Sequence, residues 1–108
     1  MTNIQFRTHD PRLHEIILHR SRYINHIWSN HPVVAAEYIQ DVVEDPEFIT
    51  LDVDDEYIEN YYRQEVIVDY PDLYLKVCVL FKTSEQGRVI TAFPVDWPKT
   101  EEETLWQK

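Results

Sequence analysis

The chain has 108 residues, of which 20 are acidic and 10 are basic, so its formal net charge is -10. This length fits one domain, and 44% hydrophobic with 13% aromatic residues is enough for one core and argues against disorder. No apolar run is long enough to span a membrane, and the polar N-terminus lacks the apolar centre of a signal peptide. The single cysteine excludes an internal disulfide, and the single glycine excludes glycine-rich nucleotide-binding loops. We therefore expect a single domain over residues 1–108, without a membrane segment, in a reducing cytoplasm.

Charge is distributed unevenly along the chain. Residues 41–72 contain twelve acidic residues and one basic residue, Arg63, whereas all five histidines lie within residues 1–31 beside four arginines. Overall acidity argues against ordinary nucleic-acid binding, for which proteins usually present a basic domain. Two interpretations stay open. The acids only keep a small protein in solution, or a small basic cleft in an acidic protein binds phosphate locally.

The N-terminal part of the chain has helical signals. Asp10 and Pro11 have the residue types of a helix cap and of a first helical position. Apolar residues then recur over residues 13–28 with mostly helical spacing. The pattern predicts a first helix over about residues 11–27.

A second helix and four strands are predicted to follow. The apolar stripe over residues 34–43 predicts a helix that opens at the Asn30-His31-Pro32 turn. After Pro46 the apolar period changes to two, which is typical of strands. The expected strands cover about residues 49–53, 57–70, 73–81 and 88–95. A capping-box pair, Thr100 and Glu103, predicts a short C-terminal helix.

Helices first and strands afterwards predict an α+β fold with an antiparallel sheet. The expected arrangement has two N-terminal helices packed on a four-stranded antiparallel sheet, followed by a short C-terminal helix.

The most informative local cluster is His26-Ile-Trp-Ser-Asn-His31-Pro32. A pair of histidines can supply a general base and a general acid near neutral pH. That chemistry suits RNA cleavage without a metal, in which the ribose 2′-OH loses a proton and the leaving 5′-oxygen gains one. A structural interpretation stays open beside it, in which His31 caps the second helix and His26 covers the end of the first.

Other site chemistries have weaker signals. The histidines do not recur at the i, i+4 spacing that places two metal ligands on one helical face. The acidic residues at 52–56 lack the glycine of a calcium-binding loop. Cys78 lies in an apolar strand and is expected in the core. We predict no metal and no cofactor.

Four segments, HIWSNHPVV, VVEDPEFI, YLKVCVLF and GRVITAFP, follow one another over residues 24–94. In this order they resemble the phage-barnase type of the barnase–EndoU–colicin–RelE (BECR) nuclease superfamily. The resemblance implies metal-independent RNA cleavage, often by toxins in conflict between phage and host. It also implies small α+β domains with N-terminal helices on a four-stranded antiparallel sheet.

The resemblance assigns His26 and His31 to acid/base roles, Lys76 to the phosphorane charge and Thr91 to the phosphate. The family block usually has an arginine before His-Pro, where this chain has Asn30, so another arginine would have to supply that charge. One register of the two longest strands puts Lys76 and Thr91 on opposite faces, and a slip of one residue puts them on the same face. The candidate catalytic residues are His26, His31, Lys76 and Thr91, and the candidate substrate-binding residues are Arg22, Asn30 and Arg63.

We therefore expect a metal-independent, toxin-like endoribonuclease that uses histidine acid/base chemistry, with RNA as substrate and an antitoxin or another protein as partner. One alternative is a catalytically silent relative that binds a protein or a nucleic acid, which Asn30 and the net charge of -10 favour. Another is an acidic regulatory partner that mimics phosphate charge through residues 52–59. A shared, solvent-open pocket around His26, His31, Lys76 and Thr91 would favour the enzyme, whereas burial of both histidines with their nitrogens satisfied by the backbone would favour the silent relative.

Overall fold

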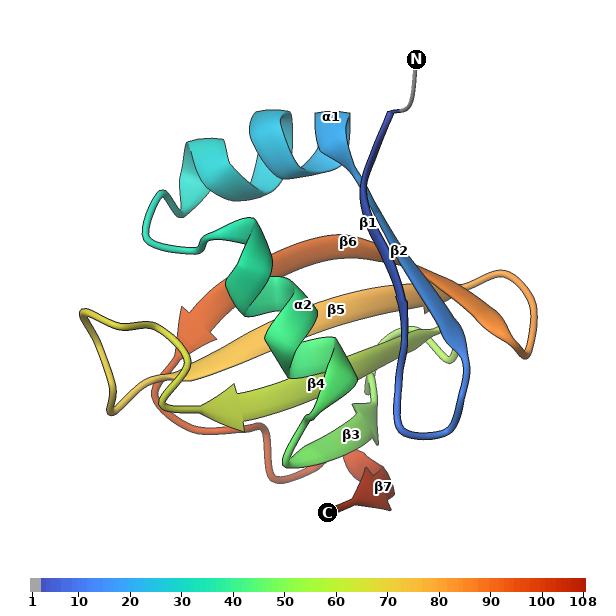
Figure 1. Ribbon diagram of the computed structural model, residues 1–108. Helices are drawn as coiled ribbons and strands as arrows, with labels where there is room; N and C mark the ends of the chain where they lie inside the picture. Colours follow the sequence, from blue (N-terminus) through green and yellow to red (C-terminus); the bar gives the residue numbers. More distant parts are fainter. Residues whose placement is uncertain (1–2) are drawn as a thin grey trace.

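The computed structural model describes residues 3–108. Its elements in chain order are β1 (Ile4–His9), β2 (Glu15–His19), α1 (Arg20–Arg22), the π-helix η1 (Tyr23–Trp28), α2 (Ala36–Glu44), β3 (Phe48–Leu51), β4 (Ile58–Gln64), β5 (Tyr74–Phe81), β6 (Gln86–Val95) and β7 (Glu103–Gln107). The seven strands of this described part form one sheet in the order β1-β2-β6-β5-β4-β3-β7 (Figure 1). Neighbouring strands are antiparallel except β2 and β6, which are parallel. The predicted two helices on a four-stranded antiparallel sheet are therefore wrong, and the fold is α+β only in a loose sense.

A hairpin stands where most of the first helix was predicted. The Asp10 carboxylate does not cap a helix, because its Oδ1 accepts hydrogen bonds from the backbone N–H of Arg12 (2.9 Å) and His14 (3.0 Å). These bonds hold the turn between β1 and β2, in which Leu13 has a left-handed φ of 67°. Residues 16–18 are three consecutive apolar residues and all are buried. Such a run fits a strand covered on both faces better than one face of a helix.

The chain becomes helical at Arg20 and stays helical through Asn30. The six central residues of this helical segment form η1, whose i to i+5 hydrogen bonds widen the turn. The Asn30-His31-Pro32 sequence ends this segment rather than opening the next helix, since the His31 N–H donates to the Ile27 carbonyl at 2.8 Å. As a result α2 begins only at Ala36.

The C-terminal helix predicted from Thr100 is also wrong, because β7 forms there and pairs with β3. Glu102, just before β7, is only 6% exposed. Its carboxylate accepts hydrogen bonds from Thr50 Oγ1 (2.7 Å), Tyr62 Oη (2.7 Å) and Asn60 Nδ2 (3.0 Å). A buried carboxylate needs such partners, and these lie on β3 and β4. The contacts hold the chain against the sheet and override the local capping pattern.

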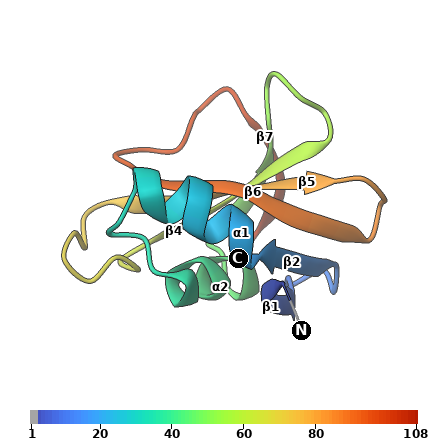
Figure 2. The ribbon, with the colours of Figure 1, turned by 90° about the horizontal axis from the view of Figure 1, so that it is seen from above.

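The two faces of the sheet are covered differently. On one side, the α2 face, α2 packs across the strands, and the segment between β6 and β7 crosses the other side, the back face (Figure 2). Ile39, Val42 and Val43 of α2 are fully buried in one core cluster with residues of β5. Gly87 of β6 belongs to the same packing, because a Cβ there would lie 2.5 Å from Val79 Cγ1. No helix among residues 3–108 has the length and apolar character needed to cross a membrane.

Asp10 also joins the β1–β2 hairpin to β4. Its Oδ2 accepts hydrogen bonds from Tyr61 Oη at 2.6 Å and from Arg12 Nη2 at 2.8 Å, and Arg12 Nη2 lies 2.7 Å from Glu59 Oε1. Burial raises the pKa of Asp10, but the hydrogen bonds from Tyr61 and Arg12 lower it more, so its pKa lies below the ordinary value of 3.8. The folded protein therefore stabilises the ionised form of Asp10.

We predict that Asp10→Ala lowers the free energy of unfolding by about 3 kcal/mol near neutral pH, because Arg12 and Tyr61 lose a buried charged partner. The pKa of Asp10 is lower in the folded protein than in the unfolded chain. Its contribution to the free energy of unfolding is therefore complete at pH values above the unfolded-state pKa, and it is lost as the pH falls through the folded-state pKa. Urea denaturation at several pH values should show that the difference in free energy of unfolding between wild type and variant becomes smaller as the pH is lowered.

The matched control is Asp69→Ala, since Asp69 is exposed in the loop between β4 and β5. It should change the free energy of unfolding by less than about 0.5 kcal/mol. Equal effects of the two substitutions at all pH values would contradict the assigned role of Asp10.

Candidate functional site

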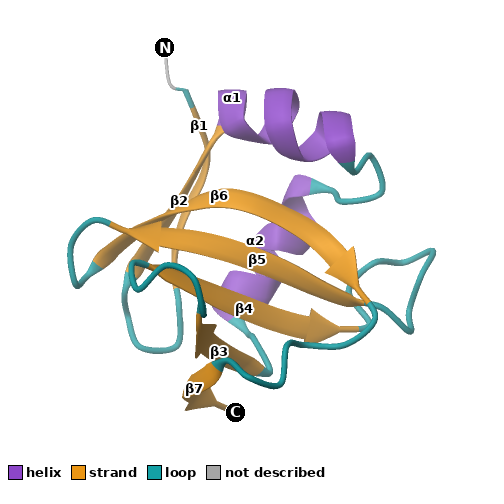
Figure 3. Ribbon diagram, turned by 180° about the vertical axis from the view of Figure 1, so that it is seen from behind, coloured by secondary structure: helices purple, strands orange, loops and turns teal. Residues whose placement is uncertain are grey.

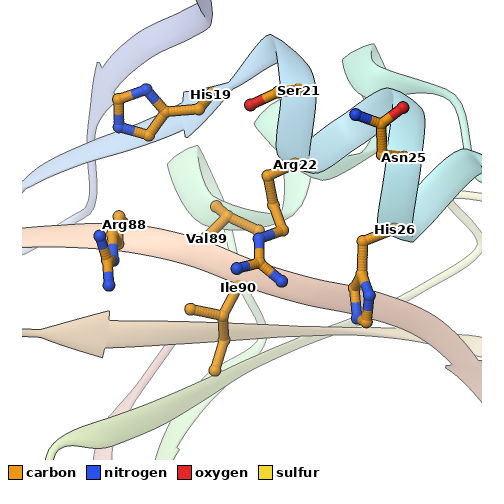
Figure 4. Close-up of a pocket in the computed structure, with 8 residues that line it drawn as sticks. All are labelled: His19, Ser21, Arg22, Asn25, His26, Arg88, Val89 and Ile90. Carbon is orange, nitrogen blue, oxygen red and sulfur yellow. The ribbon is translucent and has the colours of Figure 1, made fainter.

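A groove of about 360 Å³ lies between the helical segment and β6. Its lining residues, drawn in Figure 4, are His19, Ser21, Arg22, Asn25, His26, Arg88, Val89 and Ile90. Two histidines and two arginines line it, and none of its lining residues in the described part of the chain is acidic, so we call it the basic groove.

The groove exists because the parallel pairing of β2 with β6 is short. It covers three residue pairs and ends where Ile17 lies opposite Arg88. Beyond Arg88, within residues 3–108, no strand lies on this side of β6, and the helical segment runs along it instead (Figure 3). The β5–β6 register shifts between Cys78 and Val79, which leaves Ile90 without a partner on β5. Such a bulge re-aims a side chain, and Ile90 lines the groove.

The helical segment and the end of β2 bring the basic side chains together. Arg22 and His26 are four residues apart on one helical segment, a spacing that places them on the same face. His19 is the last residue of β2, just before the helical turn begins. In Figure 4 the guanidinium of Arg22 lies between the His26 imidazole and Arg88, and His19 lies above Arg88 on the same side of the hollow.

The groove holds uncompensated positive charge. His19, Arg22, His26 and Arg88 are all exposed. No ion pair within 4 Å involves any of them in the described part of the chain, whereas Arg12, Arg63, Lys76 and Lys108 each face a carboxylate there. Cations without partners, on walls that carry no carboxylate, attract anions even when the whole protein is acidic. An arginine fork is suited to a phosphate group because it can donate two hydrogen bonds at once.

The structure places Lys76 and Thr91 on the back face, away from the basic groove. Lys76 lies opposite Phe93 and Thr91 opposite Cys78. Neither predicted register is therefore observed, although the two residues do share a face. Lys76 is 5% exposed, and its Nζ lies 3.6 Å from Glu102 Oε2. Its charge is thus directed at a buried carboxylate, and neither Lys76 nor Thr91 lines the groove.

Cys78 lies beside Lys76 on the same face and is buried. Burial raises the pKa of its thiol to about 11, although the positive charge of Lys76 lowers it in part. At neutral pH the thiol is therefore protonated and is not a nucleophile.

The remaining predicted site residues are dispersed. His31 directly follows the helical segment and is half-buried. Its ring centroid lies 6.0 Å from that of Phe93 on β6. Asn30 Nδ2 donates to the His26 carbonyl at 2.7 Å and so caps the C-terminal end of its own helical segment. Arg63 is on β4, 3.8 Å from Asp45. Of the seven candidates, only Arg22 and His26 meet in the groove.

The sequence interpretation missed His19 and Arg88. Both lie on strands next to the point where β2 and β6 separate, and assigning residues 15–19 to a helix concealed this. The usable signal was the consecutive apolar run before His19, which indicates a buried strand.

Among residues 3–108, no group of three or more histidine, cysteine, aspartate or glutamate side chains is arranged to hold a metal ion. Comparison of the chain with protein-family models, curated proteins and solved structures finds no match. The resemblance to the BECR nucleases therefore stays a prediction.

We predict that Lys76→Met destabilises the fold by about 3 kcal/mol, because Glu102 is left as a buried carboxylate without its cation. Arg22→Gln, on the exposed groove wall, should change the free energy of unfolding by less than about 0.5 kcal/mol. Urea denaturation of both variants checks this, with Lys99→Met as the control at an exposed lysine. A Lys76→Met protein as stable as wild type would contradict the structural role of Lys76.

Proposed function

We propose that the protein is a metal-independent endoribonuclease whose active site is the basic groove. The observation that carries the proposal is the convergence of two histidines and two arginines in one groove. Among the residues that the structure describes, neither arginine has an ion-pair partner and no carboxylate lines the groove. It agrees with the activity that the sequence resemblance implies.

RNA cleavage without a metal needs three contributions from the protein. A general base removes the proton of the 2′-OH, whose oxygen attacks the adjacent phosphorus. Cations stabilise the negative charge of the phosphorane. A general acid then protonates the departing 5′-oxygen. The products carry a 2′,3′-cyclic phosphate and a 5′-OH, so atoms and charge balance without a cofactor.

Each contribution has a candidate in the groove. We assign phosphate binding and charge stabilisation to Arg22 and Arg88, whose guanidinium groups donate in pairs. We assign proton transfer to His26 and His19, one acting as base and the other as acid. Arg22 thus takes the charge role that Asn30 lacks, and Lys76 has no part in the chemistry.

RNA is the proposed substrate, and a protein that covers the groove, such as an antitoxin, is the proposed partner. The single cysteine, with its protonated thiol, suits a reducing cytoplasm, where we place the activity.

Binding without cleavage is the second candidate function. One observation favours it: the Asn30 amide, at the position where the resemblance expects arginine, is bonded to its own helix. In that case the groove holds RNA through Arg22 and Arg88, but no proton transfer follows.

The test is cleavage of a labelled oligoribonucleotide in EDTA by the wild type and by His26→Ala, His19→Ala and Arg22→Gln. We expect losses of roughly 10²–10⁴-fold for each histidine and roughly 10²-fold for the arginine. The cleaved fragments should carry 2′,3′-cyclic phosphate ends, and an all-deoxy oligonucleotide should stay intact because it lacks the attacking 2′-OH.

His9→Ala is the matched control, because His9 is an exposed histidine of β1 outside the groove. Cleavage that falls equally in this control would show a general loss of fold, and cleavage that persists equally in all variants would show a contaminating nuclease. Loss of activity in His31→Ala but not in His19→Ala would replace His19 with the histidine that the sequence first suggested. RNA binding by a folded protein without any cleavage would support the second candidate.

A further inference from the structure

We infer that the basic groove continues into a second phosphate subsite, formed by Lys82 with Arg88, so that the ligand is a single RNA strand spanning two consecutive phosphates. The inference rests on the proposed function, because it extends the same groove. It adds the substrate class, which is an oligonucleotide of at least three nucleotides rather than a dinucleotide.

A second hollow, of about 190 Å³, adjoins the basic groove on the back face of the sheet. The two hollows have His19 and Arg88 in common. Lys82 lines the second hollow, is exposed and has no ion-pair partner within the described residues. The line of basic side chains without ion-pair partners among residues 3–108 therefore runs from His26 and Arg22, through Arg88, to Lys82.

The spacing of the cations fits successive phosphates. Arg88 lies directly opposite Leu80 in the β5–β6 pair, and Lys82 is two residues beyond Leu80. Lys82 lies directly after the end of β5 at Phe81, and two residues of extended chain cover roughly 7 Å, which is comparable to the distance between neighbouring phosphates in an extended nucleic-acid strand. Arg88 and Lys82 can therefore each face a different phosphate.

The second hollow also offers an apolar floor. Ile17 is 8% exposed, Leu80 is half-buried, and both line the hollow. A ribose or the face of a base can pack on these side chains while the phosphate reaches the cations. Bare anions such as free phosphate would use only the charge, so the floor favours a nucleotide unit.

The subsite has a defined end. On its other side Lys82 borders a hollow lined by Glu56 and Glu59. Glu59 already faces Arg12, whereas Glu56 has no cation within 4 Å among residues 3–108. A phosphate placed beyond Lys82 would therefore meet negative charge. In the direction of Lys82, favourable contacts with basic side chains are therefore limited to two phosphates: one in the basic groove and one in the second subsite.

The test measures binding of fluorescent 2′-O-methyl oligouridylates, which lack the free 2′-OH and cannot be cleaved by it. A dinucleotide, a trinucleotide and a hexanucleotide present one, two and five phosphodiesters. We expect the trinucleotide to bind about tenfold more tightly than the dinucleotide, and the hexanucleotide to gain little more. Lys82→Gln should remove the advantage of the trinucleotide and reduce its salt slope by about 0.7. It should weaken dinucleotide binding less than it weakens trinucleotide binding.

Lys99→Gln is the matched control, since Lys99 is an exposed lysine outside both hollows. Equal binding of dinucleotide and trinucleotide, or an equal effect of the two lysine substitutions, would overturn the second subsite. Failure of the second subsite can be distinguished from failure of the proposed function, because the proposed function is tested by cleavage of unmodified RNA. A trinucleotide advantage that depends on Lys82 supports the subsite whether or not unmodified RNA is cut.

Discussion

The short parallel pairing of β2 with β6 is the constraint on which the candidate site depends. Three residue pairs are enough to fix the β1–β2 hairpin against the long strand β6, but the chain then leaves the sheet and becomes helical at Arg20. A longer pairing would place a strand where the groove lies. The helical segment instead runs beside β6 and presents Arg22 and His26 to it. The same separation leaves His19 and Arg88 at the mouth of the opening, so one topological feature positions all four basic side chains.

Two buried carboxylates hold this arrangement in place. Asp10 connects the hairpin turn to Tyr61 of β4, and Glu102 connects the start of β7 to β3 and β4. A buried carboxylate is stable only with several donors around it, which makes each a specific anchor. Each of these carboxylates also forms an ion pair, Asp10 with Arg12 and Glu102 with Lys76. The cations of the basic groove are therefore not needed for folding and stay available to a ligand.

The sequence predicted the central strands better than the helices. The alternating pattern of residues 73–81 and 88–95 gave β5 and β6 almost to the residue, because each has one face in the core. The first helix was wrong because Asp10 and Pro11 occur both in helix caps and in turns, and only the Tyr61 and Arg12 contacts decide between them. The C-terminal helix was wrong for a similar reason, since Glu102 finds its partners far away in the chain. In the site, Arg22 and His26 could be found from helical spacing, whereas His19 and Arg88 depend on a pairing between β2 and β6 that no local pattern contains.

The net charge of -10 does not conflict with the proposal that the basic groove binds RNA, because the acidic side chains and the unpaired basic side chains occupy different places. Arg12, Arg63, Lys76 and Lys108 each form an ion pair with a carboxylate, whereas Arg22, Lys82 and Arg88 form none with any residue from 3 to 108. Exposed charges farther away than about 8 Å are largely screened at physiological salt, so a bound phosphate senses mainly the groove. The acidic surface acts only at the edge of the groove, where Lys82 borders the hollow lined by Glu56 and Glu59. It opposes any nucleic acid whose second strand would extend over residues 52–59, and it therefore favours a single strand lying along β6.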